Sequence, residues 1–247
     1  MLKAVLFDLD GTLLPMDEKE FTEYYFGLLL KRFIPLGYDK DDLIKTVWRG
    51  TGAMLRNDGK ETNETVFWRV FTDRYGAEKI KDKAVFDEFY VTDFKKAKVV
   101  CGENPEARKI IDYVKSKGLK VILASNPVFP ICGLLTRAGF VGLGEKDFDY
   151  VTGYENSHYA KPNPKYIEET LKVNGFEKDE VLYVGNSETD DIAPAKAVGV
   201  NYFHVTDKCL KLSDVTSIIE RPVTGDCHSE RYEESPGMVS QYCALLK

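Results

Sequence analysis

Residues 4–12 read A-V-L-F-D-L-D-G-T. The apolar residues before Asp8 and the glycine near the end of the stretch predict a fully buried strand of a parallel sheet that opens into a loop. Ligands of such sheets collect at the carboxyl ends of the strands. The sequence therefore places two carboxylates, Asp8 and Asp10, where a metal ion and a reacting group are expected.

Two carboxylates this close in sequence repel each other unless a cation or hydrogen bonds compensate their charge. Magnesium is the cation we expect, because it prefers hard oxygen ligands and is commonly held by one or two carboxylates together with a substrate phosphate. An acidic turn without a ligand is the alternative, since Asp and Gly are both common in turns.

The chain after residue 103 alternates between helical and strand-like patterns. A helix is predicted from Asn104, as its cap, to residue 117, where Gly118 ends it. Further strands are predicted at residues 119–124, 149–153, 181–184 and 200–205, and further helices at residues 128–138, 165–173, 190–198 and 211–220. Together with the strand at residues 4–7, this alternation predicts an α/β fold built on a doubly wound parallel sheet.

Residues 16–97 have a different pattern, in which apolar residues recur at helical spacing. Four helices are expected, with apolar stripes at residues 21–29, 43–55, 66–75 and 85–94. We expect residues 1–15 and 98–220 to form the α/β core, residues 16–97 an inserted helical cap that covers the two aspartates, and residues 221–247 an irregular tail. The aromatic residues of the cap are expected to form mainly its own core.

Substrate specificity is expected to reside in the cap. A glycine-containing loop is expected there, lined by Trp48, Arg49, Arg56 and Asn57. These four residues are candidate substrate contacts, and the alternative for each is an ordinary surface or core position.

Polar residues follow other predicted strands or precede helices. Ser125 and Asn126 follow the second strand, Lys161 precedes a helix, and residues 186–191 follow the fourth strand. A serine hydroxyl and the backbone amide of Asn126 can donate hydrogen bonds to phosphate oxygens, and Lys161 supplies a positive charge. Each feature alone is common at turns and surfaces, but in this order they indicate a phosphate-handling site.

With these motifs, the chain from residue 1 to about residue 205 resembles the haloacid dehalogenase-like (HAD) superfamily of hydrolases. The motifs are F-D-L-D-G-T-L from residue 7, I-L-A-S-N from residue 122, A-K-P-N-P from residue 160 and V-G-N-S-E-T-D-D-I from residue 184. The helical insertion stands where the superfamily carries its cap. The resemblance implies that Asp8 is the nucleophile that forms an aspartyl-phosphate. It implies that Asp10 protonates the leaving oxygen, then activates water, and ligates Mg²⁺ through its backbone carbonyl.

Asn186 departs from the pattern of the superfamily's phosphatases, which usually have Asp after this glycine as a metal ligand. An amide offers only a neutral oxygen. Asp190 and Asp191 can compensate by direct or water-mediated contact with magnesium. One of this pair is also expected to orient Lys161, and a simple helix cap is the alternative role for Asp190.

The expected reaction is hydrolysis of a small phosphorylated metabolite. Asp10 favours an oxygen leaving group, because a dehalogenase needs neither a leaving-group acid nor magnesium, whereas a positioned acid accelerates ester cleavage. A phosphomutase, a dehalogenase or a phosphonate hydrolase of the same fold are alternatives. Asn186 is the one feature that favours the dehalogenase. A non-catalytic protein that only senses phosphate is a further alternative, in which Asn186 weakens catalysis.

The composition narrows the class of protein. The chain has 247 residues, 43% of them hydrophobic and 30% charged, and a formal net charge of -6. This is ordinary globular composition, and the negative charge disfavours nucleic acid as a partner. A membrane span is not expected, because no apolar run approaches 18 residues. Five scattered cysteines without a C-x-x-C pair favour reduced thiols and a cytoplasmic location.

Overall fold

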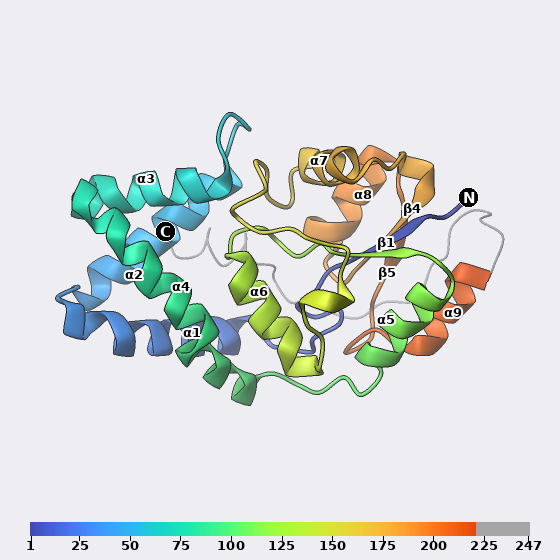
Figure 1. The fold of residues 1–247 in the computed structure, drawn as a ribbon, viewed down its shortest axis with the longest axis horizontal. Helices are drawn as coiled ribbons and strands as arrows, with labels where there is room; N and C mark the ends of the chain where they lie inside the picture. The colour runs from blue at the N-terminus through green and yellow to red at the C-terminus, as the bar shows by residue number, and fades with distance from the viewer. Residues whose placement is uncertain (221–247) are drawn as a thin grey trace.

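Five parallel strands form one sheet in the computed structural model, which describes residues 1–220 (Figure 1). The strands are β1 (Ala4–Phe7), β2 (Lys120–Leu123), β3 (Tyr150–Val151), β4 (Val181–Gly185) and β5 (Asn201–His204). Their spatial order is β3-β2-β1-β4-β5, so β1 lies at the centre. Phe7 pairs in register with Leu123 of β2 and Val184 of β4. The residues that follow these three strands therefore leave the sheet side by side.

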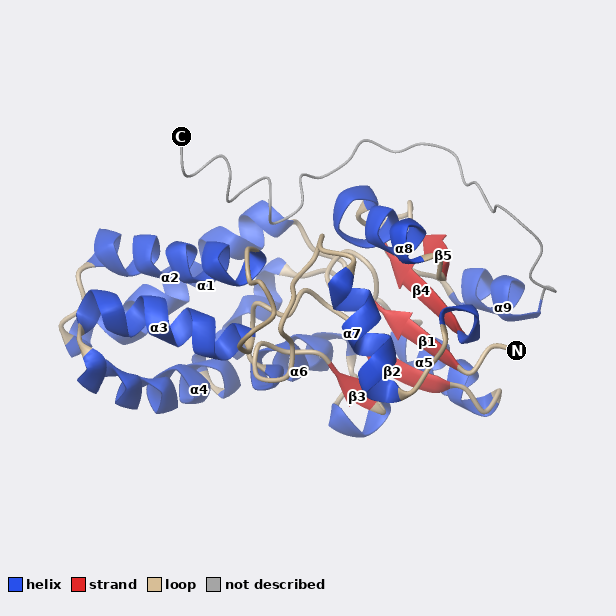
Figure 2. Cartoon of the chain, turned by 90° about the horizontal axis from the view of Figure 1, so that it is seen from above, coloured by secondary structure: helices blue, strands red, loops and turns tan. Residues whose placement is uncertain are grey.

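Helices cover both faces of the sheet (Figure 2). They are α5 (Ala107–Ser116), α6 (Ile131–Ala138), α7 (Lys165–Asn174), α8 (Ala193–Val198) and α9 (Leu212–Glu220). Successive strand residues point to opposite faces. Val5 and Phe7 of β1 belong to the buried cluster that includes α5, α6 and α9, whereas Ala4 and Leu6 belong to the cluster that includes α7 and α8. The predicted doubly wound α/β fold is confirmed.

The chain between β1 and β2 is helical throughout its regular structure, as the apolar stripes predicted. It contains α1 (Glu18–Phe33), α2 (Lys40–Leu55), α3 (Asn63–Tyr75) and α4 (Lys83–Val91), followed by helical turns over Asp93–Val100. The strand arrows in Figure 2 point toward these helices, which therefore lie beyond the carboxyl ends of the strands. The division of the chain into a core and a cap domain stays a prediction.

The prediction of a loop around Trp48 is wrong. Trp48 and Arg49 lie within α2, Arg56 caps the carboxyl end of this helix, and Asn57 follows it. A side chain at Gly50 would come within 2.5 Å of the Phe67 ring of α3. The glycine therefore permits close helix packing rather than a turn.

Several element boundaries also differ from the predictions. The third strand contains only Tyr150 and Val151, and α5 begins at Ala107 rather than directly after Asn104. The buried Asn104 instead accepts a hydrogen bond from the Glu106 N–H at 3.1 Å and donates one to the carbonyl of Leu13 at 3.0 Å. Its side chain thus joins loops that are far apart in sequence.

Some predictions concern features outside the sheet and helices. Cys101, Cys132 and Cys209 are free thiols, while Cys227, Cys243 and the tail predicted at residues 221–247 lie outside the described residues. Within residues 1–220 no helix is both long and apolar enough to cross a membrane.

Candidate active site

Asp8 is the first residue after the central strand β1. Its backbone N–H donates to the carbonyl of Val184 at 2.8 Å, so the main chain is still tied to β4 at this point. Its carboxylate is buried and accepts hydrogen bonds on both oxygens. Lys161 Nζ donates to Oδ1 at 2.7 Å, and Thr12 Oγ1 donates to Oδ2 at 3.1 Å. The carboxylate is therefore held in one orientation at the edge of the sheet.

Lys161 bridges two carboxylates. Its ammonium group, 2% exposed, donates to Asp8 at 2.7 Å and to Asp191 Oδ1 at 2.6 Å. The Tyr183 hydroxyl donates to the same oxygen of Asp191 at 3.0 Å. The other Asp191 oxygen accepts from the backbone N–H groups of residues 186–187 at 3.1 and 3.0 Å. Asp191 is thus the member of the aspartate pair that orients Lys161, and both of its oxygens are occupied.

The electrostatics of this pair follow from burial and charge. Burial raises the pKa of Asp8 to about 7, with further increases from the charges of Asp191 and Asp10. Lys161 opposes this shift but does not cancel it. Burial works against the charge of Lys161, yet the two carboxylates outweigh it and hold its pKa well above the usual value. The site therefore favours cations and has more negative charge than Lys161 alone can compensate.

Asp10 forms an ion pair with Arg137 of α6, whose side chain is 1% exposed. The guanidinium lies over the Phe129 ring, 4.5 Å from its centroid. Burial raises the pKa of Asp10, while the charge of Arg137 lowers it. Asp10 Oδ1 and the Nε and Nη2 atoms of Arg137 are buried without a hydrogen-bond partner among the described residues. Buried polar groups without a protein partner are typical of places where an ion, a water molecule or a ligand binds.

Ser125 and Asn126 lie where β2 leaves the sheet, beside Asp8. The backbone carbonyl of Ser125 accepts hydrogen bonds from the hydroxyls of Thr152 and Tyr166, both at 3.0 Å. These bonds fix the turn that carries the buried Ser125 side chain. Both polar atoms of the Asn126 side chain are buried and lack a partner within residues 1–220. The Asn126 amide group is thus a second orphaned polar group at this edge.

Asn186 lies beside the first motif. Thr12 Oγ1, which contacts Asp8, is also 3.2 Å from Asn186 Oδ1. Gly11 has a φ of +80°, and a Cβ at this position would collide with the Asn186 amide. A glycine is therefore required both for the backbone conformation and for the approach of Asn186.

Asp190 lies in the π-helical turn Glu188–Ile192, which precedes α8. The Ser187 hydroxyl accepts a hydrogen bond from the Asp190 N–H at 3.1 Å, so Ser187 caps this helix. The alternative prediction, in which Asp190 is a helix cap, is therefore wrong. The Asp190 carboxylate is buried and is approached by the Thr189 hydroxyl at 3.4 Å. Short π-helical segments are frequent at functional sites.

A protein-family model described as haloacid dehalogenase-like hydrolase matches residues 2–199. The chain belongs to this family. It is therefore a hydrolase of the HAD family, and its four motifs meet at the carboxyl edge of the sheet.

Relatives of this HAD hydrolase include two named phosphatases. A phosphoglycolate phosphatase from Aquifex aeolicus is 26% identical over 200 residues, which cover 79% of this chain and 81% of that protein. A glyceraldehyde 3-phosphate phosphatase from Methanocaldococcus jannaschii is 25% identical over 206 residues, covering 81% and 83%. The crystal structure of a HAD phosphatase from Thermococcus onnurineus gives a TM-score of 0.56 at 21% identity over 89% of this chain and 98% of that one. The structural likeness shows the shared fold.

The oxygen atoms around Asp8 suit magnesium better than a metal that needs a preformed cage. Among residues 1–220 no group of three or more His, Cys, Asp or Glu side chains is arranged to hold a metal ion. Magnesium commonly uses only one or two carboxylates, with water and a substrate phosphate completing its shell. The orphaned Asp10 Oδ1, the Asp190 carboxylate and the Asn186 amide oxygen fit this chemistry. Metal binding by Asp8, Asp10, Asn186, Asp190 and Asp191 stays a prediction.

Two residues near the site of this HAD hydrolase, Glu18 and Arg137, belong to none of the four sequence motifs. Glu18 begins α1, and burial together with the charges of Asp10 and Asp190 raises its pKa to about 8. It therefore faces the acidic site from the helical segment. Arg137 could have been found, because it follows the buried Leu134 by three residues and so lies on the apolar side of its helix. A charged residue on an apolar stripe needs a buried partner.

Proposed function

We propose that this HAD hydrolase is a magnesium-dependent phosphomonoester hydrolase that acts on a small phosphorylated metabolite through an aspartyl-phosphate on Asp8. The observation that carries the proposal is the fixed Asp8 carboxylate, which Lys161 and Thr12 hold at the end of the central strand. Asp10, two residues later, supplies the second carboxylate. The two relatives named as phosphatases, each covered over more than three quarters of its length, support the same reaction class.

The proposed reaction has two halves. An oxygen of Asp8 forms a bond to phosphorus while the bond from phosphorus to the leaving oxygen breaks, and Asp10 gives that oxygen its proton. A water molecule then attacks phosphorus, Asp10 takes a proton from the water, and the bond between Asp8 and phosphorus breaks. Phosphate leaves, and both aspartates return to their starting states.

The remaining residues bind and position. The Ser125 hydroxyl and the backbone amide of Asn126 would donate to the phosphate oxygens, and Lys161 would add its positive charge. We assign Asp191 to holding Lys161, because its oxygens already accept four hydrogen bonds. Bound to Asp8, the Asp10 carbonyl, Asn186 and Asp190, magnesium would neutralise the charge of the phosphate and of Asp8.

The helical segment at residues 16–97 is proposed as a cap that shields this site from water. Glu18 at the start of α1 lies near the aspartates, and Arg137 of α6 forms an ion pair with Asp10. A site with an acid at position 10 favours an ester oxygen as the leaving atom over a halide. The dehalogenase and the phosphonate hydrolase are therefore secondary candidates. The phosphomutase also cleaves a phosphate ester, and the assay below distinguishes it from the hydrolase.

Turnover of p-nitrophenyl phosphate, with magnesium or with a chelator, tests the proposal. We expect hydrolysis with magnesium, none with the chelator, and none for Asp8→Asn. Binding of phosphate without any turnover would favour the phosphate sensor instead. Transfer of phosphate between positions of a sugar phosphate would favour the mutase.

A further inference from the structure

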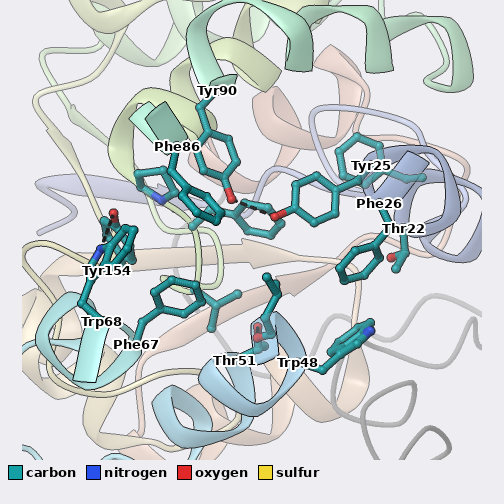
Figure 3. A pocket seen from close by; sticks show the side chains of 15 residues that line it. Thr22, Tyr25, Phe26, Trp48, Thr51, Phe67, Trp68, Phe86, Tyr90 and Tyr154 are labelled. Carbon is teal, nitrogen blue, oxygen red and sulfur yellow. Dashed lines mark hydrogen bonds between the residues drawn. The ribbon is translucent and has the colours of Figure 1, made fainter. Parts of the chain in front are cut away.

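A small aromatic cavity lies between the helical segment and the loop that follows β2 (Figure 3). Its volume is about 50 Å³, and 15 described residues line it. Ten of these are Phe, Tyr or Trp, and the others are Thr, Val and Pro, so none of the described lining residues carries a charge. The sticks in Figure 3 show that Tyr25 and Tyr90 point their hydroxyls toward each other, and these lie 3.0 Å apart.

Two parts of the chain connect this cavity to the reacting groups. Val128 and Phe129 line it and follow Ser125 and Asn126 by only a few residues. Phe129 also supports the guanidinium of Arg137, which holds Asp10. The cavity wall is thus one side chain away from the residue proposed to protonate the leaving oxygen.

Helix α1 makes the second connection. Glu18 faces Asp10 and Asp190, and Thr22, four residues later on the same side of the helix, lines the cavity. One helical turn is about 5.4 Å long. Helix α1 thus has one residue near the aspartates and, one turn later, another at the cavity.

We infer that this cavity receives the alcohol part of the substrate, and that this part is small and uncharged, as in phosphate esters of short aldehydes or neutral alcohols. The inference rests on the proposed phosphatase function. A cavity of roughly 150 Å³ binds benzene, so 50 Å³ admits a group of about two to four non-hydrogen atoms. The tyrosine hydroxyl pair can hydrogen-bond one carbonyl or hydroxyl of that group.

Charge excludes a carboxylate from the same place. A buried carboxylate is costly without a cationic partner, and the described lining residues offer none. Arg137 is not a lining residue, because its guanidinium lies against the Phe129 ring and its Nη1 pairs with Asp10. A leaving group that carries a carboxylate therefore meets a lining whose described residues offer it no positive charge.

Matched pairs of esters test this inference on the wild-type protein. Glycolaldehyde phosphate and 2-phosphoglycolate differ only in an aldehyde against a carboxylate, as do glyceraldehyde 3-phosphate and 3-phosphoglycerate. We expect kcat/KM to be at least tenfold higher for the aldehyde in each pair. Equal or better turnover of the carboxylates would overturn the inference while leaving the phosphatase function intact. If neither pair nor p-nitrophenyl phosphate is hydrolysed, the proposed function fails first.

A cavity-filling variant tests the location. Val47→Phe places a ring in the cavity, and Val99→Phe makes the same change at a site that is 71% exposed. We expect Val47→Phe to lower kcat/KM for the aldehyde esters at least tenfold and to leave inhibition by inorganic phosphate unchanged, while Val99→Phe alters neither. If Val47→Phe does not fold, Val47→Leu, which adds a smaller volume, replaces it in this test. Wild-type kinetics in a folded Val47 variant would show that the cavity does not receive the substrate.

Discussion

Replacing Asp8 with asparagine should abolish turnover and at the same time stabilise the metal-free protein. The amide lacks the anionic oxygen that attacks phosphorus, so no aspartyl-phosphate can form. The amide oxygen can still accept the hydrogen bond from Lys161, which is 2.7 Å long in the wild type. The amide NH2 group can donate to the Thr12 hydroxyl, which is 3.1 Å from the second Asp8 oxygen and can itself donate to Asn186 Oδ1. The substitution therefore removes a charge and preserves the shape of the site.

The size and sign of the stability change follow from the pKa of Asp8. Burial raises this pKa from 3.8 to about 7. Because the folded value lies above the unfolded value, the folded wild type loses stability as the pH rises from about 4 to about 7. At 1.36 kcal/mol for each pKa unit, the penalty approaches roughly 4 kcal/mol above pH 7. The pKa of about 7 already includes the attraction to Lys161. The variant avoids the whole penalty, so its gain should approach roughly 4 kcal/mol at pH 8.

Urea unfolding between pH 4 and pH 8 in the presence of a chelator measures this gain. The free energy of unfolding of the variant should match the wild type near pH 4 and exceed it increasingly toward pH 8. Asp73→Asn, an exposed position on α3, is the matched control and should show no such trend. A difference that does not depend on pH, or a variant less stable than the wild type at pH 8, would refute the reasoning.

Three further substitutions separate the roles of the other residues. Asp10→Asn should slow alkyl phosphates far more than activated aryl phosphates, and equal slowing of both would exclude the acid role. Lys161→Met leaves two buried carboxylates unpaired and should cost about 3–5 kcal/mol of unfolding free energy, whereas the exposed Lys165→Met should cost little. Asn186→Asp should tighten magnesium about tenfold in calorimetric titration, since a charge pair at about 4 Å is worth roughly 4 kcal/mol at a dielectric near 20, less repulsion from nearby aspartates. Unchanged affinity would place residue 186 outside the metal shell.

Much of this site could be predicted because its information is local. A strand such as residues 4–7 is recognisable from its apolar run, and a parallel sheet brings the residues after each strand to one edge. Asp8 and Ser125 therefore meet as expected, with Phe7 and Leu123 paired just before them. Lys161 was placed correctly beside an aspartate of the 190–191 pair, because a buried ammonium group requires a carboxylate.

The residues that were missed depend on tertiary packing. The place of Arg137 on the apolar side of α6 indicates a buried partner but does not identify that partner as Asp10. Glu18 is an ordinary first-turn acid until α1 brings it near the aspartates. The glycines of α2 led to a wrong prediction of a loop within a helix. Gly50 suggested a loop, whereas the ring of Phe67 on a neighbouring helix explains why the position has no side chain. Local sequence does not specify such contacts between distant elements.

The charge balance of the site links Arg137 to the unusual Asn186. The carboxylates of the site are the buried Asp8, Asp190 and Asp191 and the partly buried Asp10, and its buried cations are Lys161 and Arg137. With all six ionised, four negative and two positive charges leave two negative charges, which one divalent cation compensates. An aspartate at position 186 would leave a third. The neutral amide would thus suit the proposed site, in which one magnesium ion would balance the remaining charge. The Asn186→Asp titration measures how much metal affinity the amide costs.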